Sequence, residues 1–260
     1  MSEINFMPQI SVVIITYNEE QNIGRCIDSL QGVADEIVIV DSFSTDATEA
    51  ICRKRGVKFV QHKFEGHIEQ KNYAITQATH PCVLSLDADE ALDDELRQSI
   101  LAVKENWTAD GYKMNRVTNY CGKWMWYGGW YPDTKLRLWK SNKGAWGGLN
   151  PHDEFIMEES AKVIQLKGNL LHYSYYSVEG HVSQMNKFSS ISAKSYYDKG
   201  KRSNVFLIVT KPLIAFLKAY LLKRGFLSGY YGFVIGIMDA QTTFLKYVKL
   251  REYQQQQKNK

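Results

Sequence analysis

The sequence predicts an α/β fold, with a mostly parallel sheet followed by a C-terminal helical extension. Short β-branched runs alternate with helical patterns in the first half, strand-like pieces follow from Gly111, and the pattern is helical after Val178. With 260 residues, 44% of them hydrophobic, the chain can bury a sizeable core. We therefore expect one domain at residues 1–198 and a basic, apolar helical extension at residues 199–260.

Four apolar runs in the first half predict buried strands, at residues 10–15, 36–41, 57–60 and 82–86. Helices should fill the gaps between them. We expect Asn18 to cap a helix that starts at Glu19, and Thr45 or Asp46 to cap a second helix that stops at Gly56. Such a sheet binds ligands beyond the carboxyl ends of its strands, so residues 16–19, 41–46 and 87–90 should meet at one edge.

The composition favours a cytoplasmic protein. Its four cysteines are far apart and form no C-x-x-C pair, which fits a reducing compartment. The first nine residues are polar and include an acid, so they do not resemble a secretory signal.

The positive charge is concentrated near the C-terminus. Residues 1–198 hold 20 basic and 26 acidic side chains, a net charge of −6, whereas residues 199–251 hold ten Lys and Arg against the single acid Asp239, a net charge of +9. These basic residues alternate with a strongly apolar stretch. The pattern favours an anionic membrane surface as partner and argues against nucleic acid.

A D-x-D motif ends the last of the predicted strands. Asp87 and Asp89 follow the apolar run Leu84-Ser85-Leu86, which places them at the edge of the sheet. A hard cation such as Mg²⁺ or Mn²⁺ could take oxygen ligands there from carboxylate and from a substrate diphosphate. The alternative is that the two acids simply open a loop before the next helix.

Two further motifs precede this one at the spacing of successive βα units, Ser-Val-Val-Ile-Ile-Thr-Tyr-Asn-Glu at 11–19 and Glu-Ile-Val-Ile-Val-Asp-Ser-Phe-Ser-Thr-Asp at 36–46. Together the three motifs resemble family 2 glycosyltransferases, which have the A-type, Rossmann-like nucleotide-diphospho-sugar transferase fold. The resemblance extends over residues 9–175. It is greatest to the small, non-processive enzymes of the lipopolysaccharide core, such as core β-1,4-glucosyltransferases, because the Gln-x-x-Arg-Trp signature of processive synthases is absent.

This resemblance implies a metal-dependent, inverting transfer of a sugar from a nucleotide-diphosphate donor to a hydroxyl of a lipid-linked saccharide acceptor, in lipopolysaccharide core or surface glycan synthesis. It implies a nucleoside pocket made by Thr16, Tyr17, Glu19 and Asp41, although packing alone could also explain Tyr17. Asp87 would contact the ribose and Asp89 the metal. Lys71, which precedes Asn72 where the family often has Arg-Asn, would reach the diphosphate, unless it belongs to a solvated helix face.

An inverting transfer needs a base for the acceptor hydroxyl, and a carboxylate is the usual choice. A Gly-rich stretch leads to His152, Asp153 and Glu154, and the family has a His-Glu pair after a comparable stretch. The resemblance aligns His152 and Asp153 with that pair and leaves Glu154 as an extra acid. We favour Asp153 but keep both acids as candidates. The alternative is a solvated acidic turn after Pro151.

Two aromatic-rich segments could complete the site. His172 resembles a family His-Tyr element near the diphosphate and could be a metal ligand, or it could be a structural histidine. A loop dense in Trp, Tyr and Gly could stack on the sugar or lipid of the acceptor, or could be core. Its aromatic members are Trp124, Trp126, Tyr127, Trp130 and Tyr131.

The C-terminal extension predicts a peripheral attachment to the inner face of the cell membrane. Its apolar runs, residues 205–222 and 226–238, are separated by Lys223, Arg224 and Gly225. The first run is of about minimum spanning length and contains charge, and the second is too short to cross roughly 30 Å of hydrocarbon. We expect an interfacial helical pair, with packing on the first domain or on a second copy of the chain as the alternative.

Two other functions would fit the same elements. One is a non-catalytic, membrane-associated scaffold of the same fold, against which the intact acids argue. The other is a nucleotidyltransferase, which would normally open with a Gly-rich, basic loop after the first strand, where residues 16–20 are acidic and lack glycine.

Overall fold

The structure is a computed structural model that describes residues 8–149 and 152–258. The chain forms two compact units, and each is made of two stretches of sequence. The first unit is Met1–Arg116 with Asp133–Tyr173, and the second is Val117–Pro132 with Ser174–Lys260.

The first unit is built on a mixed sheet. Its elements are β1 (Ile10–Thr16), α1 (Ile23–Asp28), β2 (Glu36–Asp41), α2 (Thr48–Lys54), β3 (Lys58–Gln61), α3 (His67–Thr76), β4 (Cys82–Asp87), β5 (Glu90–Leu92), α4 (Asp94–Glu105), β6 (Gly111–Tyr120), β8 (Asp133–Lys140), β9 (Gly144–Leu149), β10 (His152–Met157) and β11 (Val163–Tyr175). The last residues of β6 and β11 belong to the second unit.

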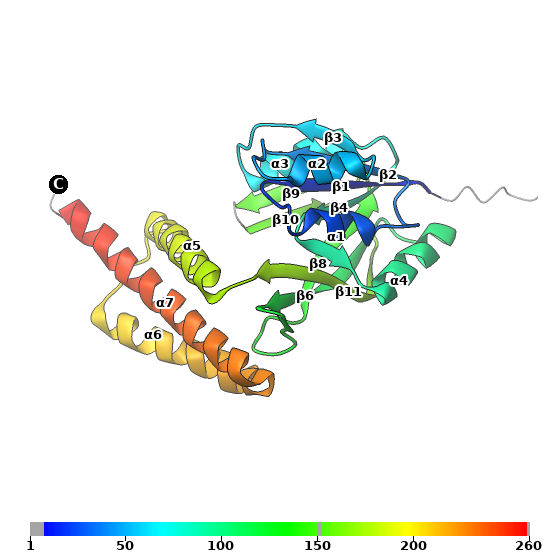
Figure 1. Ribbon diagram of the computed structural model, residues 1–260. Helices are drawn as coiled ribbons and strands as arrows, with labels where there is room; N and C mark the ends of the chain where they lie inside the picture. The colour runs from blue at the N-terminus through cyan, green and yellow to red at the C-terminus, as the bar shows by residue number, and fades with distance from the viewer. Residues whose placement is uncertain (1–7, 150–151, 259–260) are drawn as a thin grey trace, which may run out of the picture. The chain divides into compact units, whose positions relative to one another are not determined.

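The strands lie in the order β3-β2-β1-β4-β8-β6-β11-β5, and β9 and β10 form a separate two-stranded sheet (Figure 1). The pairs β1–β2, β1–β4 and β2–β3 are parallel, whereas β8 joins β4 in the antiparallel direction. The predicted α/β fold with a parallel sheet and a C-terminal helical extension is confirmed. Antiparallel strands from the middle of the chain widen this sheet.

The four predicted strands correspond to β1 to β4 with boundaries that differ by one residue at most. The predicted Asn18 cap is wrong, because α1 starts only at Ile23. Asn18 instead lies in the left-handed region at φ 53°, and its side-chain oxygen accepts the backbone N–H of Thr45 at 2.8 Å. The N-cap of α2 is Ala47 rather than the predicted Thr45 or Asp46, although Asp46 accepts the N–H of Thr48, the first residue of the helix, at 3.0 Å.

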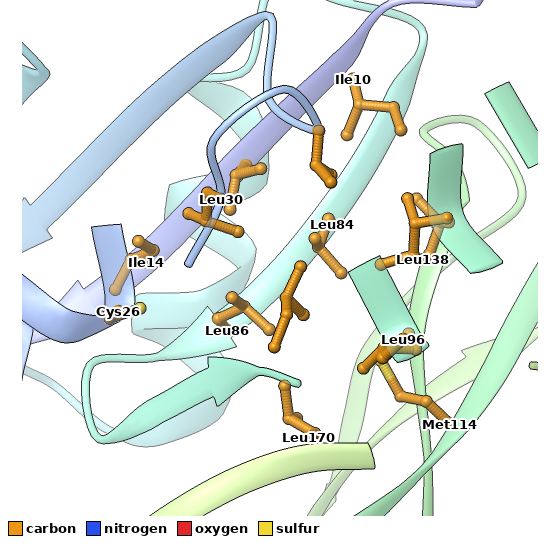
Figure 2. Close-up of a cluster of buried hydrophobic side chains, with 14 of the residues drawn as sticks. Ile10, Ile14, Cys26, Leu30, Leu84, Leu86, Leu96, Met114, Leu138 and Leu170 are labelled. Atoms are coloured by element: carbon orange, nitrogen blue, oxygen red, sulfur yellow. The ribbon is translucent and has the colours of Figure 1, made fainter. Parts of the chain in front are cut away.

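Each face of the sheet has its own core, because side chains alternate along a strand. Ile10 and Ile14 of β1 pack in a cluster with Cys26 of α1 and Leu96 of α4 (Figure 2). The opposite face packs against α3 and the β9–β10 hairpin. There the rings of Trp139 and Phe155 stack with centroids 3.6 Å apart, alongside Val13, Ala74 and Trp146. Burial of these rings fixes the hairpin against the sheet.

The second unit is mainly helical. Its elements are β7 (Lys123–Trp124), α5 (Val178–Asp198), α6 (Val205–Leu217), a π-helical turn (Lys218–Leu222), a 3₁₀ turn (Gly225–Ser228) and α7 (Gly229–Lys258). The compact units place the boundary before α5, not after residue 198, because α5 packs against α7. Lys249 of α7 donates hydrogen bonds of 2.8 Å to the Asn186 carbonyl and to the Ser189 hydroxyl on α5.

An aromatic cluster forms part of the core of this unit. Tyr120, Trp130, Tyr175 and His181 pack with ring centroids 4.6–6.1 Å apart, and the Tyr120 hydroxyl lies 3.0 Å from His181 Nδ1. Trp130 is therefore largely a packing residue. Trp126 and Tyr127 of the same loop are exposed, so their predicted contact with the acceptor stays a prediction.

We expect His181 to make the stability of the protein depend on pH. Burial lowers the pKa of His181 from 6.5. The neutral imidazole therefore contributes stability above the unfolded pKa, and this contribution is lost as the pH falls through the folded value. His181→Gln should reduce the pH dependence of the unfolding free energy below about pH 6.5 by up to about 1.4 kcal/mol per pH unit. Urea titrations at several pH values measure this slope.

The matched control is His67→Gln, since His67 is exposed. This variant should keep the wild-type slope. An unchanged slope in His181→Gln would contradict the assignment.

Candidate active site

The carboxyl ends of three parallel strands meet at one edge of the sheet. Thr16 pairs with Asp41 across β1 and β2, and Ile15 pairs with Asp87 across β1 and β4. The three predicted polar segments therefore converge, because neighbouring parallel strands end at the same edge.

The loops after β1 and β2 are fixed to one another. Asp41 is fully buried, and its carboxylate accepts hydrogen bonds from the backbone N–H and the hydroxyl of Ser44. The Ser44 hydroxyl in turn accepts the N–H of Asn18 at 2.8 Å. The Thr16 hydroxyl is buried without a hydrogen-bond partner among the residues that the structure describes. Asp41, the last residue of β2, thus helps to preorganise the loops that follow β1 and β2.

Two aromatic rings on these loops are exposed. Tyr17 is 58% exposed and Phe43, which lies at φ 60°, is 53% exposed. Packing does not explain Tyr17, and the sequence analysis missed Phe43. Exposed rings of this kind offer faces on which a planar base can stack.

Negative charge gathers at the same edge. Burial raises the pKa of Glu19 to about 7, against a hydrogen bond from Asn22, and the charges of Asp89, Asp46 and Asp87 raise it further. The Asn22 amide donates to the Glu19 carboxylate at 2.7 Å. A cation at this edge would relieve the repulsion among these carboxylates.

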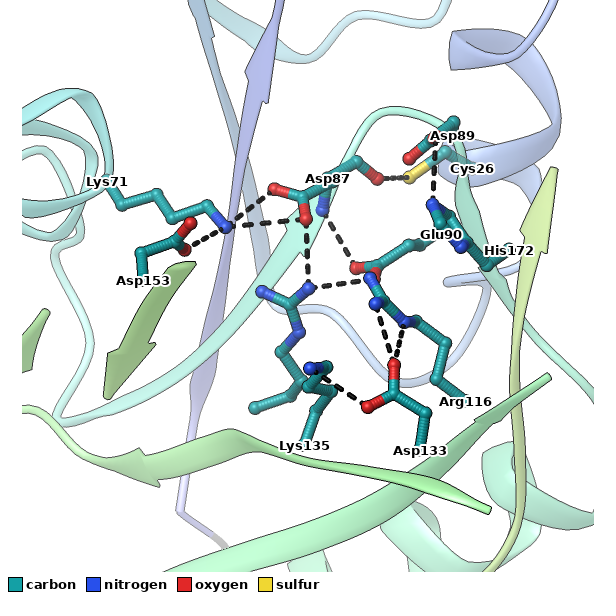
Figure 3. Close-up of polar contacts among 11 residues, drawn as sticks. Cys26, Lys71, Asp87, Asp89, Glu90, Arg116, Asp133, Lys135, Asp153 and His172 are labelled. Atoms are coloured by element: carbon teal, nitrogen blue, oxygen red, sulfur yellow. Dashed lines mark hydrogen bonds and ion pairs between the residues drawn. The ribbon is translucent and has the colours of Figure 1, made fainter. Parts of the chain in front are cut away.

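Asp87 is paired with two buried cations (Figure 3). Its carboxylate lies 3.0 Å from Lys71 Nζ and 2.9 Å from Arg137 Nη2, and these two side chains are only 4% and 3% exposed. Burial alone would raise the pKa of Asp87, but Lys71 and Arg137 outweigh it and hold the pKa well below its usual range. Asp87 is therefore ionised and already neutralised by the protein.

The ion pairs continue beneath Asp87. The buried carboxylate of Glu90 accepts Arg137 at 2.7 Å and Arg116 at 3.1 Å, and also the N–H of Asp87 at 3.0 Å. Arg116 pairs with Asp133 as well. This network was not predicted from the sequence, although Arg137 is a charge flanked by Leu136 and Leu138 in the predicted strand. Loss of one member would leave a buried charge unpaired, which is costly.

Asp89 and His172 form a separate pair. Asp89 Oδ2 lies 3.1 Å from His172 Nε2, and both side chains are partly exposed. The two predicted metal ligands are thus adjacent, whereas the described residues contain no group of three or more His, Cys, Asp or Glu that could hold a metal. One carboxylate and one imidazole fit a cation whose remaining ligands are water and phosphate oxygens, as is usual for ions shared with a substrate.

The two candidate bases differ in their surroundings. Asp153 Oδ2 accepts Lys71 Nζ at 2.7 Å, so Lys71 bridges Asp87 and Asp153. Glu154 is the next residue of β10, is exposed and points to the opposite face of the strand. The His152 side chain lies outside the described residues. The interpretation of Lys71 as part of a solvated helix face is wrong, because its side chain is buried.

Asn72 fixes the hairpin that carries Asp153. Its amide donates to the Trp146 carbonyl at 2.9 Å and accepts the Trp146 N–H at 3.0 Å. Lys71 Nζ lies 4.4 Å from the centre of the Trp146 ring. The Lys71-Asn72 dipeptide of α3 thereby holds β9 and β10 at the edge of the sheet, a role for Asn72 that the sequence analysis missed.

Comparisons with known proteins agree with this architecture. The family described as "Glycosyl transferase family 2" matches residues 11–157. An uncharacterized glycosyltransferase of Rickettsia typhi is 32% identical, covering 97% of this chain and 90% of the relative. The lipopolysaccharide core biosynthesis glycosyltransferase LpsC of Rhizobium meliloti is 30% identical, covering 93% of this chain and 91% of the relative.

A solved structure shows the same fold. The mannosyltransferase PcManGT from Pyrobaculum calidifontis, in complex with GDP-Man and Mn²⁺, superposes with a TM-score of 0.54 at 16% identity, covering 94% of this chain and 87% of the other. The family matches over more than half of the chain, and the relatives match along nearly all of it. The protein therefore belongs to glycosyltransferase family 2 and has the A-type nucleotide-sugar transferase fold.

Proposed function

We propose that this glycosyltransferase moves a sugar, with inversion, from a nucleotide-diphosphate donor to a hydroxyl of a lipid-linked saccharide, in lipopolysaccharide core or surface glycan synthesis, with Mg²⁺ or Mn²⁺. The observation that carries the proposal is the Lys71 bridge, which places a carboxylate from the β9–β10 hairpin next to the D-x-D acid Asp87. The similarity to LpsC supports the class of acceptor.

The donor would lie across the edge of the sheet. Tyr17 and Phe43 offer exposed rings to the base, and Asp87 offers an oxygen to the ribose. Asp41 and Thr16 are buried, so Asp41 would act by ordering the loop that carries Phe43, and direct contacts of these two residues with the nucleoside stay predictions. Glu19 lies among the same acids, and a cation beside them would favour its ionised form.

Asp89 and His172 are the residues that would hold the cation. Asp89 suits this role better than Asp87 does, because two protein cations already neutralise Asp87. A divalent ion bound there supplies positive charge beside the diphosphate and offsets the charge that develops on the leaving group. PcManGT, of the same fold, was solved with Mn²⁺ and a nucleotide sugar, which supports this choice of cofactor.

Asp153 would be the general base. It takes the proton of the acceptor hydroxyl, whose oxygen forms a bond to the anomeric carbon from the face opposite the diphosphate. The bond from that carbon to the diphosphate oxygen breaks, and its electron pair leaves with the nucleoside diphosphate. Attack from the opposite face inverts the anomeric configuration. The 2.7 Å contact with Lys71 orients Asp153, and the predicted reach of Lys71 to the donor phosphates stays a prediction.

Release of nucleoside diphosphate from a panel of nucleotide sugars, with Mg²⁺, Mn²⁺ or a chelator, tests the reaction class. We expect slow, metal-dependent hydrolysis of one donor and faster release with a saccharide acceptor. Release of pyrophosphate would indicate a nucleotidyltransferase, and the absence of turnover with every donor and acceptor would indicate a scaffold.

We predict that Asp89→Ala abolishes transfer and removes metal-dependent donor binding, because it deletes the oxygen ligand of the cation. Calorimetric titration of the donor with and without Mn²⁺ measures the effect. Asp94→Ala, which removes a fully exposed acid of α4, is the matched control and should behave as wild type. Near-normal turnover of Asp89→Ala would refute the metal assignment.

We predict that Asp153→Asn keeps donor affinity but lowers the transfer rate by a factor on the order of 100 or more, as expected when a general base is lost. Steady-state kinetics with saturating donor give this rate. Glu154→Gln is the control and should retain most of the activity. If Glu154→Gln proves to be the damaging change, the base is Glu154 and the proposed role of Asp153 fails.

A further inference from the structure

We propose that the α6–α7 pair docks on an anionic lipid bilayer as an interfacial helical hairpin. The proposal rests on residues of the second unit alone and does not depend on the chemistry proposed for the first. The partner that we propose is a lipid surface. The two alternatives, a contact between copies of the chain and a helix that crosses the membrane, become outcomes of the test.

The first observation is a helix with no buried side chain. None of the residues of α6 is buried, although most of them are apolar. Large exposed side chains recur every three or four residues along α6 and the π-helical turn that continues it, at Phe206, Val209, Leu213, Leu217 and Leu221. With about 3.6 residues per turn these side chains share one face of the helix. Val205, Ile214 and Leu222 are exposed as well. A soluble helix would normally bury such a stripe against its own protein.

The stripe continues around the turn and along α7. Phe226 and Leu227 are exposed in the 3₁₀ turn, and Tyr230, Phe233 and Ile237 are exposed at the start of α7. α7 runs beside α6 and packs on it (Figure 1), with Gly236 close to the Phe216 ring. The pair therefore presents one apolar surface, which we call the hairpin face, made by Phe206, Val209, Leu213, Leu217, Leu221, Phe226, Leu227, Tyr230, Phe233 and Ile237.

The second observation is the charge around the hairpin face. Lys211 and Lys218 are exposed and, being seven residues apart, lie almost in line beside the apolar stripe of α6. Lys223 and Arg224 are exposed at the turn. Long basic side chains beside an apolar stripe can lie along it and reach up to lipid headgroups. This arrangement is complementary to anionic lipid, whereas two copies packed through the same face would bring like charges together.

An interfacial position fits better than a spanning one. Val205–Leu222 is the one segment among the described residues that is long and apolar enough to cross a membrane, with 18 residues and a mean hydropathy of 1.9. At 1.5 Å per residue it extends about 27 Å, less than the roughly 30 Å hydrocarbon core. It also carries Lys211 and Lys218, and α7 would bring Asp239 to a similar depth. A helix along the interface keeps all three groups near water.

Co-sedimentation of the full-length chain with vesicles tests the proposal. At low salt we expect strong binding to phosphatidylcholine vesicles that contain phosphatidylglycerol and weak binding to phosphatidylcholine alone, because each basic residue near an anionic surface adds affinity. High salt or an alkaline wash should release the protein. Equal binding to both vesicles, or no binding to either, would overturn the proposal, and so would a protein that only detergent releases.

Paired variants identify the surface. Lys211→Gln with Lys218→Gln should lower binding to anionic vesicles by roughly 30-fold, about 5-fold for each charge. The matched control is Lys63→Gln with Lys113→Gln, two exposed lysines of the first unit, and it should bind as wild type. Leu213→Ser with Leu217→Ser should also lose binding, whereas Phe64→Ser, at an exposed position of the first unit, should not. Equal losses in test and control variants would contradict the assignment.

Two further measurements keep these outcomes distinct. Circular dichroism and urea midpoints show whether each variant folds. Sedimentation velocity without lipid shows whether the hairpin face instead joins two copies of the chain. A dimer that does not bind anionic vesicles would overturn the proposal. The vesicle assay needs no donor sugar, so its result stands whether or not the proposed transfer is observed.

Discussion

The buried ammonium of Lys71 is the constraint on which the active-site edge depends. An unpaired charge away from water is costly, so Lys71 must be met by carboxylates, and it has two, Asp87 at 3.0 Å and Asp153 at 2.7 Å. These acids come from strands of different sheets. Because Lys71 contacts both acids, the end of β4 and the β9–β10 hairpin lie next to each other. The same side chain therefore satisfies an electrostatic requirement of the fold and assembles the groups that we propose for donor and acceptor.

Neighbouring contacts make this arrangement rigid. Arg137 holds the other side of Asp87 and is itself paired with Glu90. Two hydrogen bonds between the Asn72 side chain and the Trp146 backbone, one donated and one accepted by Asn72, fix the hairpin to α3. Preorganised groups need little reorganisation when substrate binds, so little binding free energy is spent on ordering them. This is an advantage for a site that must orient a donor and a base together. Asp89 remains outside the network, beside His172, where a cation can approach it.

The sequence predicted what depends on local pattern. Alternating apolar runs located β1 to β4 within one residue, and their order along the chain predicted that Asp41 and Asp87 would end at one edge. It did not predict contacts between residues distant in sequence. Arg137 meets Glu90 across 47 positions, and Asn72 meets Trp146 across 74. Asn18 does not cap a helix, and its side chain instead accepts the N–H of Thr45, 27 positions away. The helical unit begins before α5 and not after residue 198, because α5 packs on α7, a contact between distant segments that the sequence pattern does not show.

We infer that Lys71 and Asp153 act as one unit in sugar transfer. A double-mutant cycle with Lys71→Met, Asp153→Asn and the combined variant, measured as the transfer rate at saturating donor, tests it most directly. If Lys71 acts by holding Asp153 in place, the combined variant should be little slower than Asp153→Asn alone, because both changes remove the same arrangement. Losses that multiply, as for two independent residues, would show that Lys71 does not act through Asp153.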